Sequence, residues 1–210
     1  MKIALINGSP KNKNSNSGHL LHELKAPLEN GNNIISEFFF KKPQISIKDM
    51  EHLVESNILV FAFPLYVDGI PSHLLECLIQ LESFILSRKK KDIIVYSIVN
   101  CGFYEGHQSA IAIEMMKNWC TKAEIQWGQG IGVGAGEILN INVPIGYGPK
   151  KNLGLAMKKM VDMILNCRSG DDIYINPNFP RILYKLGGEK GWRKAIRANG
   201  LKRKDLFLRR

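Results

Sequence analysis

The sequence lacks three features that would each decide its class: a long hydrophobic run, paired cysteines and a standard nucleotide motif. Its first apolar stretch, residues 3–6, ends at Asn7 and is too short for a signal peptide, and no transmembrane run follows. The cysteines lie far apart with no C-x-x-C pair, which argues against a zinc or cysteine-ligated iron–sulfur site. We therefore expect a protein of the reducing cytoplasm, with no bound metal. The four cysteines are Cys77, Cys101, Cys120 and Cys167.

Acidic residues are scarce only at the C-terminal end. The net charge is +10, yet residues 181–210 contain eleven Lys and Arg against Glu189 and Asp205. The first 180 residues contain 18 basic and 17 acidic side chains and are nearly neutral. The basic character therefore belongs to a C-terminal segment and not to the main domain.

Apolar segments alternate with helical patterns along most of the chain. Strand-like runs are separated by segments whose apolar residues recur at helical spacing. This alternation predicts an α/β fold with one doubly wound sheet of five parallel strands and helices on both faces. We assign residues 1–168 to this domain and residues 169–210 to a basic, helical C-terminal extension. The five predicted strands are residues 3–6, 34–40, 58–63, 93–99 and 130–139.

The loop after the first strand is rich in hydroxyl, amide and ammonium groups. It lies between a strand and the start of a helix, where unpaired backbone N–H groups attract an anion. Its composition fits a single terminal phosphate, such as that of FMN, although a plain polar turn with Ser17 as the helix N-cap is the alternative. The predicted phosphate-binding residues are Ser9, Lys11, Ser15, Asn16 and Ser17.

Two further loops leave predicted strand ends beside the first. In a doubly wound sheet, ligands bind beyond the carboxyl ends of the strands, at the point where strand order reverses. The second loop offers apolar walls and the third offers glycine, aromatic and carboxylate groups, which suits a flat ring with a polar edge. We predict contacts from Pro64, Leu65, Tyr66, Val67, Asn100, Cys101, Gly102, Tyr104 and Glu105. For Glu105 we assign the contact to its backbone N–H and leave the side-chain role open.

Three motifs together resemble the NAD(P)H-dependent FMN reductase family of flavodoxin-like proteins. They are Gly-Ser-Pro-Lys at residues 8–11 with Ser-Asn-Ser at 15–17, Phe-Pro-Leu-Tyr at 63–66, and Asn-Cys-Gly-Phe-Tyr-Glu-Gly at 100–106. The resemblance covers residues 1 to about 167. It implies a flavodoxin-like fold, bound FMN, hydride uptake from NADH or NADPH, a small acceptor such as a quinone or flavin, and a homodimer. Lys11 departs from the family pattern, which more often has Arg.

Other interpretations compete with this assignment. A flavodoxin-type electron carrier without nicotinamide turnover is the main rival, but such carriers are usually strongly acidic around the flavin. The glycines of residues 130–136 are spaced G-x-G-x-G-x-G, which favours close backbone packing over a second dinucleotide site. Cys101 has no neighbouring His or Lys and is interpreted as a passive loop residue. The basic extension is not expected to bind nucleic acid or membranes.

The chemistry assigned to the cofactor needs no protein acid or base, so we name no catalytic residue. We predict FMN and not FAD, because the sequence shows one phosphate-type loop and no separate adenosine site.

Overall fold

The computed structural model describes residues 1–11, 14–90, 92–202 and 204–205. The chain divides into two compact units, Met1–Pro177 and Asn178–Arg210.

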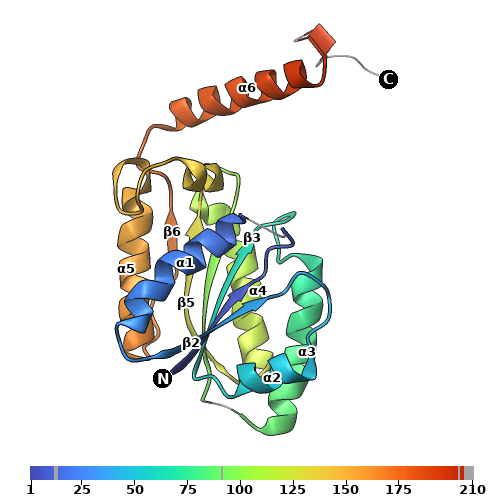
Figure 1. Cartoon of the computed structure of the whole chain (residues 1–210), viewed down its shortest axis with the longest axis vertical. Helices are drawn as coiled ribbons and strands as arrows, with labels where there is room; N and C mark the ends of the chain where they lie inside the picture. Colours follow the sequence, from blue (N-terminus) through green and yellow to red (C-terminus); the bar gives the residue numbers. More distant parts are fainter. Residues whose placement is uncertain (12–13, 91, 203, 206–210) are drawn as a thin grey trace. The chain divides into compact units, whose positions relative to one another are not determined.

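The first unit is a parallel sheet with helices on both faces (Figure 1). The strand order is β2-β1-β3-β4-β5-β6, and every adjacent pair is parallel. Strand order reverses between β1 and β3, which creates the crevice expected of a flavodoxin-like sheet. The strands are β1 Lys2–Asn7, β2 Ile34–Phe39, β3 Ile58–Pro64, β4 Ile94–Asn100, β5 Gln126–Val133 and β6 Ile173–Ile175.

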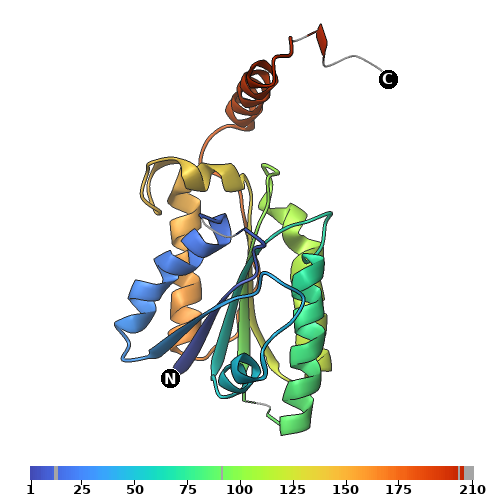
Figure 2. The same ribbon diagram turned by 45° about the vertical axis from the view of Figure 1, so that its right-hand side comes forward.

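Helices α1 and α5 cover one face of this sheet, and α2, α3 and α4 cover the other (Figure 2). Short 3₁₀ segments, labelled η, precede α4 and α5 and follow β5. The helices are α1 Asn16–Glu29, α2 Ile47–Val54, α3 Ser72–Arg88, α4 Ala110–Lys122 and α5 Lys151–Leu165, and the 3₁₀ segments are η1 Gly106–Ser109, η2 Gly136–Asn140 and η3 Gly148–Lys150.

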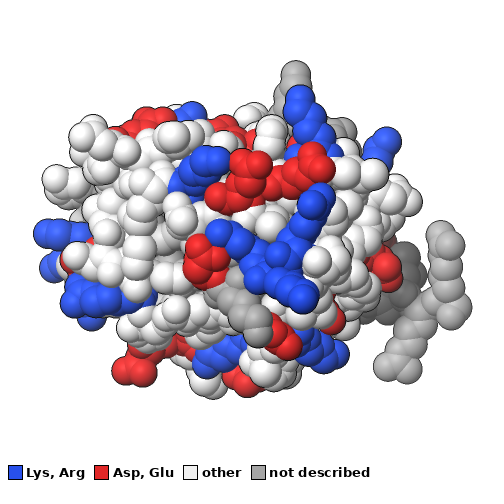
Figure 3. All heavy atoms as spheres, turned by 90° about the horizontal axis from the view of Figure 1, so that it is seen from below, with Lys and Arg blue, Asp and Glu red and all other residues white. Residues whose placement is uncertain are grey.

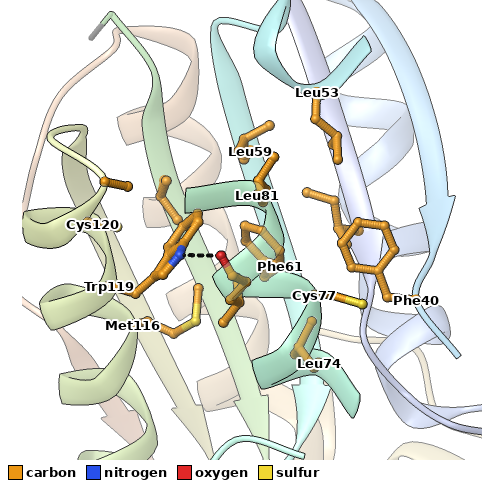
Figure 4. Packing of buried hydrophobic residues seen from close by; sticks show 14 of the residues in the cluster. Phe40, Leu53, Leu59, Phe61, Leu74, Cys77, Leu81, Met116, Trp119 and Cys120 are labelled. Atoms are coloured by element: carbon orange, nitrogen blue, oxygen red, sulfur yellow. Dashed lines mark hydrogen bonds between the residues drawn. The ribbon is translucent and has the colours of Figure 1, made fainter. Parts of the chain in front are cut away.

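The continuous apolar run of β3 explains its central position. Its first six residues are buried, as both faces of a covered parallel strand must be. On the α3–α4 side, Phe61 meets Trp119 edge to face, with ring centroids 5.8 Å apart (Figure 4). The indole Nε1 of Trp119 donates a hydrogen bond to the Leu78 carbonyl oxygen at 2.9 Å, so its polar atom is satisfied inside the core.

Two sequence predictions about the sheet need correction. The sheet has six strands and not five, and the fifth covers residues 126–133 instead of 130–139. The sixth strand lies within the stretch assigned to the extension from residue 169. Asp172 anchors it, because its Oδ1 accepts hydrogen bonds from the Gly130 N–H at 2.8 Å and the Trp127 Nε1–H at 3.2 Å. A three-residue strand is too short to leave a periodic signal.

The glycines of β5 allow close approach of neighbouring backbone, as predicted. A Cβ on Gly132 would lie 2.6 Å from the carbonyl oxygen of Gly106. A Cβ on Gly134, the residue that follows β5, would overlap the carbonyl oxygen of Tyr104. The glycines thus let the loop after β4 pack against β5, which is the structural role favoured for them over a dinucleotide site.

Acidic and basic side chains both occur on the surface seen from below in Figure 3. This mixture agrees with the near-neutral charge of the first 180 residues. Among the described residues, no helix is long and apolar enough to cross a membrane.

The second unit contains helix α6, Arg181–Ala198, which has no buried residue. The helix falls within residues 169–210, the segment expected from the sequence to be basic and helical. Gly200 follows with a φ of 72°, the left-handed conformation in which many helices end. Trp192 and Leu186 are both exposed.

Candidate functional site

The loop between β1 and α1 is held by the side chain of Asn7. Its Oδ1 accepts a hydrogen bond from the Ser9 N–H at 3.0 Å, and its Nδ2 donates to the Ser15 Oγ at 3.1 Å. The Ser15 Oγ also accepts from the Gly18 N–H at 3.1 Å, so Ser15 is the N-cap of α1. A Cβ on Gly8 would lie 2.6 Å from the Leu74 Cδ2 and 3.1 Å from the Phe63 Cβ, so a larger residue would require Leu74 to shift. Both ends of the loop are thus fixed before any ligand binds.

The start of α1 has the features expected of the anion-binding element predicted from the sequence. The first two helical residues, Asn16 and Ser17, have backbone N–H groups with no acceptor within the helix. No acidic residue lies in the first turn, and Lys11 is exposed on the same loop. The helix dipole and the Lys11 ammonium therefore both favour a phosphate.

Asn100 connects the three strand ends that surround the crevice. Its Nδ2 donates to the Ser17 Oγ at 3.0 Å and to the Phe63 carbonyl oxygen at 3.1 Å. Its own carbonyl oxygen accepts from the Leu65 N–H at 2.9 Å. Asn100 is only 6% exposed, so these bonds are sheltered from water and hold the loops of β1, β3 and β4 in one arrangement.

The loop after β3 makes a tight turn beside the crevice. Tyr66 and Gly69 exchange both backbone hydrogen bonds, at 3.0 and 3.1 Å. Between them Val67 and Asp68 have φ values of 47° and 61°, the left-handed geometry of a type I′ turn. A β-branched residue is strained in that conformation. The turn presents Leu65 and Tyr66, the latter 46% exposed, as apolar walls.

A fourth loop, η2, completes the crevice. The Gly136 carbonyl oxygen accepts from Asn16 Nδ2 at 2.9 Å, and the Gly136 N–H donates to the Cys101 carbonyl oxygen at 2.7 Å. Lys150 fixes the other end of this loop: its Nζ donates to the carbonyl oxygens of Leu139 at 3.0 Å and Ile141 at 2.9 Å. Lys150 is 2% exposed, and desolvation lowers its pKa.

These four loops enclose a cavity of about 360 Å³. Its size lies in the range of small-molecule sites. Its lining residues are Ser9, Lys11, Asn14, Asn16, Pro64, Leu65, Tyr66, Asn100, Cys101, Gly102, Gly136, Glu137 and Asn140.

Nine of the fourteen predicted site residues line this cavity. These are Ser9, Lys11, Asn16, Pro64, Leu65, Tyr66, Asn100, Cys101 and Gly102.

The other five predicted residues are placed elsewhere. Ser15 caps the helix, and the hydroxyl of Ser17, 1% exposed, accepts from Asn100. Val67 is fully exposed at the tip of its turn. Tyr104 and Glu105 lie where the chain bends toward η1: the Tyr104 carbonyl faces Gly134, and the Glu105 carbonyl accepts from the Cys101 Sγ at 3.7 Å. None of the five is among the described residues of the cavity wall.

The residues that η2 contributes were not predicted from the sequence. Glu137 and Asn140 line the cavity, and Lys150 holds their loop from outside it. The sequence carries one signal for these residues, which is the position of their loop directly after a strand. Because the strands of the sheet are parallel, that strand ends at the same edge as the others and its loop lies beside theirs. Extending the predicted strand to residue 139 concealed that signal.

The residues present fit a flavin bound through its phosphate. One end of the cavity offers Lys11, Asn14 and Asn16 beside the start of α1. The other end offers the apolar surfaces of Leu65 and Tyr66, with backbone groups of residues 100–102 along the edge. A loop suited to an anion, close to two apolar side chains, fits a phosphate linked to an aromatic ring.

Cys101 lines the cavity as a neutral thiol. It is 4% exposed, and desolvation raises its pKa above the ordinary value of 9.0. The structure thus agrees with a passive role for this cysteine. Among the described residues, no three His, Cys, Asp or Glu side chains cluster closely enough to hold a metal ion.

Comparison with known proteins identifies the fold. No protein-family model matches the sequence, and a search of curated proteins finds no match. Among solved structures, the chain is similar to an NADH:FMN oxidoreductase in its apo form, with a TM-score of 0.63 and 12% identity over 80% of this chain and 90% of that one.

Two further structures are also similar to this chain. One is an NADPH-quinone reductase from P. pentosaceus, with a TM-score of 0.58 and 15% identity over 77% of this chain and 98% of that one. The other is a short-chain flavodoxin associated with a bacterial microcompartment, with a TM-score of 0.56 and 13% identity over 80% and 100% of the two chains. Together the three matches confirm the predicted flavodoxin-like fold.

Proposed function

We propose that this protein is a flavin-dependent oxidoreductase that uses NADH or NADPH to reduce a small acceptor, such as a quinone or free flavin. The observation that carries the proposal is the 360 Å³ cavity at the reversal point of the sheet, where a loop suited to an anion lies near the apolar side chains of Leu65 and Tyr66. Two of the similar structures, the NADH:FMN oxidoreductase and the NADPH-quinone reductase, are named for such reactions, which supports the proposal.

The chain's own residues bind and orient the flavin. Lys11 and the first N–H groups of α1 hold the phosphate, with Asn14 and Asn16 beside them. Tyr66 and Leu65 bound the ring, and the backbone of residues 100–102 supplies donors and acceptors along its polar edge. When bound, FMN supplies a ring that accepts and returns hydride. The protein therefore contributes position and exclusion of water, with no side chain assigned as acid or base.

Charge separates this proposal from the flavodoxin-type electron carrier. Among the described residues lining the cavity, Glu137 is the one acidic side chain and Lys11 the one basic side chain. The residues before 181 are nearly neutral. A carrier that docks protein partners through an acidic surface would need a different charge pattern, whereas a small uncharged acceptor needs none.

Exposed apolar side chains on α3 support a homodimer as part of the same proposal. Leu75, Ile79 and Leu86 are 37%, 51% and 41% exposed. Their spacing of four and then seven residues places them along one side of the helix. A row of this kind on a surface helix is typical of an interface between protein chains. Light scattering on the purified protein should give twice the chain mass, and Ile79→Glu should halve it.

Anaerobic mixing with NADH or NADPH tests the proposed activity. The visible absorption of the bound, oxidised flavin should disappear after the nicotinamide is added, and it should return when a quinone is added. If the flavin is reduced by a one-electron donor and by neither nicotinamide, the carrier function replaces the enzymatic one.

A further inference from the structure

A second cavity adjoins the first across the residues assigned to the flavin phosphate. It measures about 420 Å³ and lies between the start of α1 and the end of β2. Lys11, Asn14, Asn16 and Asn140 line both cavities. A ligand whose phosphate lies at these residues therefore has room on two sides.

The second cavity has its own aromatic wall. Phe39 is 58% exposed, although its neighbours Phe38 and Phe40 are 8% and 4% exposed. Side chains alternate along a strand, and both neighbours belong to the core beneath α2 and α3. Phe39 is therefore directed to the opposite face, where α1 lies, and its ring forms part of the cavity wall.

The remaining side chains of this cavity suit an anion linked to an aromatic base. His19 and His22 lie three residues apart on one face of α1 and both line the cavity. No Asp or Glu is among its described lining residues. The Lys41 Nζ lies 5.6 Å from the centroid of the Phe39 ring, which adds positive charge at the rim. An aromatic face, two imidazoles and a shared phosphate cradle are the groups that stack and position a nucleobase.

We propose that the second cavity binds an adenylate group, with Phe39 stacking on the adenine and His19 and His22 beside the ribose and phosphate. The inference rests on the proposed flavin function, because it assumes that the shared residues hold the flavin phosphate. Two molecules could place an adenylate group in this cavity. One is FAD, whose adenylate half extends from the flavin phosphate itself, and the other is NADH or NADPH, through its own adenylate half. The shared phosphate cradle favours FAD, because its adenylate is attached at that point. This inference departs from the prediction of FMN and not FAD made from the sequence, which showed no separate adenosine site.

Binding measurements on the full-length protein, after removal of any bound flavin, test this assignment. Apo-protein is titrated with FMN and with FAD by flavin fluorescence, and FMN-loaded protein is titrated with 5′-AMP by calorimetry. The wild-type chain should bind FAD about tenfold more tightly than FMN, since stacking of a base on an aromatic ring is worth about that factor. Phe39→Ala and His22→Ala should remove the preference for FAD and leave FMN affinity within about twofold. Phe39 and His22 are both exposed, so neither change is expected to unfold the chain.

Ile34→Ala is the matched control, because Ile34 is an exposed apolar residue at the opposite end of the same strand. If FAD shows no preference but the AMP affinity of the FMN-loaded protein falls in both variants, the adenylate belongs to the nicotinamide donor and the inference holds. If FMN binds but neither FAD nor AMP distinguishes the variants from wild type and control, the inference is overturned and the proposed function stands. If no flavin binds, both are overturned.

Discussion

Replacing Asn100 tests the internal framework of the site. In Asn100→Ala, the Ser17 Oγ and the Phe63 carbonyl oxygen each lose their hydrogen bond from Nδ2, at 3.0 and 3.1 Å. A net contribution of about 0.5–1.5 kcal/mol for each bond gives a loss of about 1–3 kcal/mol in the free energy of unfolding. Flavin affinity should also fall about tenfold or more, because the Asn100 side chain no longer connects the loops of β1, β3 and β4 through its hydrogen bonds.

Urea unfolding of the apo-protein measures the first effect, and a fluorescence titration with FMN measures the second. Asn118→Ala is the control, because Asn118 is exposed on α4 and lies away from the strand ends. Asn100→Asp should weaken FMN binding more than Asn100→Ala does, since it adds a negative charge beside the phosphate cradle. The reasoning is refuted if the unfolding free energy of Asn100→Ala stays within about 0.5 kcal/mol of the control and FMN affinity is unchanged.

Four further outcomes are expected. Tyr66→Ala should weaken FMN binding by about 0.5–1.5 kcal/mol in a titration, with little change in unfolding because Tyr66 is 46% exposed; a loss of stability alone would make it a structural residue. Val67→Asn should raise the unfolding free energy by about 1 kcal/mol in urea, because asparagine tolerates the φ of 47° that strains valine; a decrease would contradict the turn geometry. Truncation after Gly170 removes β6 and Asp172 and should lower the thermal unfolding temperature of the domain. Truncation after Pro177 keeps both and should leave that temperature unchanged. If the two truncations change the unfolding temperature equally, β6 contributes nothing to stability. Burial raises the pKa of Cys77 to about 11 and the pKa of Cys101 above its ordinary value, so both thiols stay protonated near neutral pH. Iodoacetamide should therefore label the exposed Cys167 first, as measured by mass spectrometry. Labelling of Cys101 before Cys167 would mean that Cys101 is an activated thiol.

The sheet was predictable where apolar runs were long. Residues 58–63 are continuously apolar, and only a strand covered on both faces is buried in that way. Strand β6 was missed because three residues carry no period, and it is fixed instead by Asp172, whose partners are more than forty residues away in sequence. The sequence does not reveal a contact of that range.

The site was predictable as a meeting of loops but not in its detailed contacts. Parallel strands bring their carboxyl ends to one edge, so the loops after residues 7, 63 and 100 had to converge. The helix begins at Asn16 with Ser15 as its cap, whereas the plain-turn alternative had Ser17 there. In the structure Ser15 and Ser17 support the loop through hydrogen bonds with Asn7, Gly18 and Asn100, and their contact with a phosphate stays a prediction. Lys150 escaped notice because its two acceptors are backbone carbonyls, which no side-chain pattern reports.

The absorption spectrum of the purified protein, recorded before and after titration with FMN, tests the central claim most directly. The account predicts visible flavin absorption that remains with the protein through gel filtration, or saturable quenching of FMN fluorescence at one flavin per chain. A colourless protein that leaves added FMN free in solution, with its fluorescence unquenched, would contradict the assignment of the cavity to a flavin.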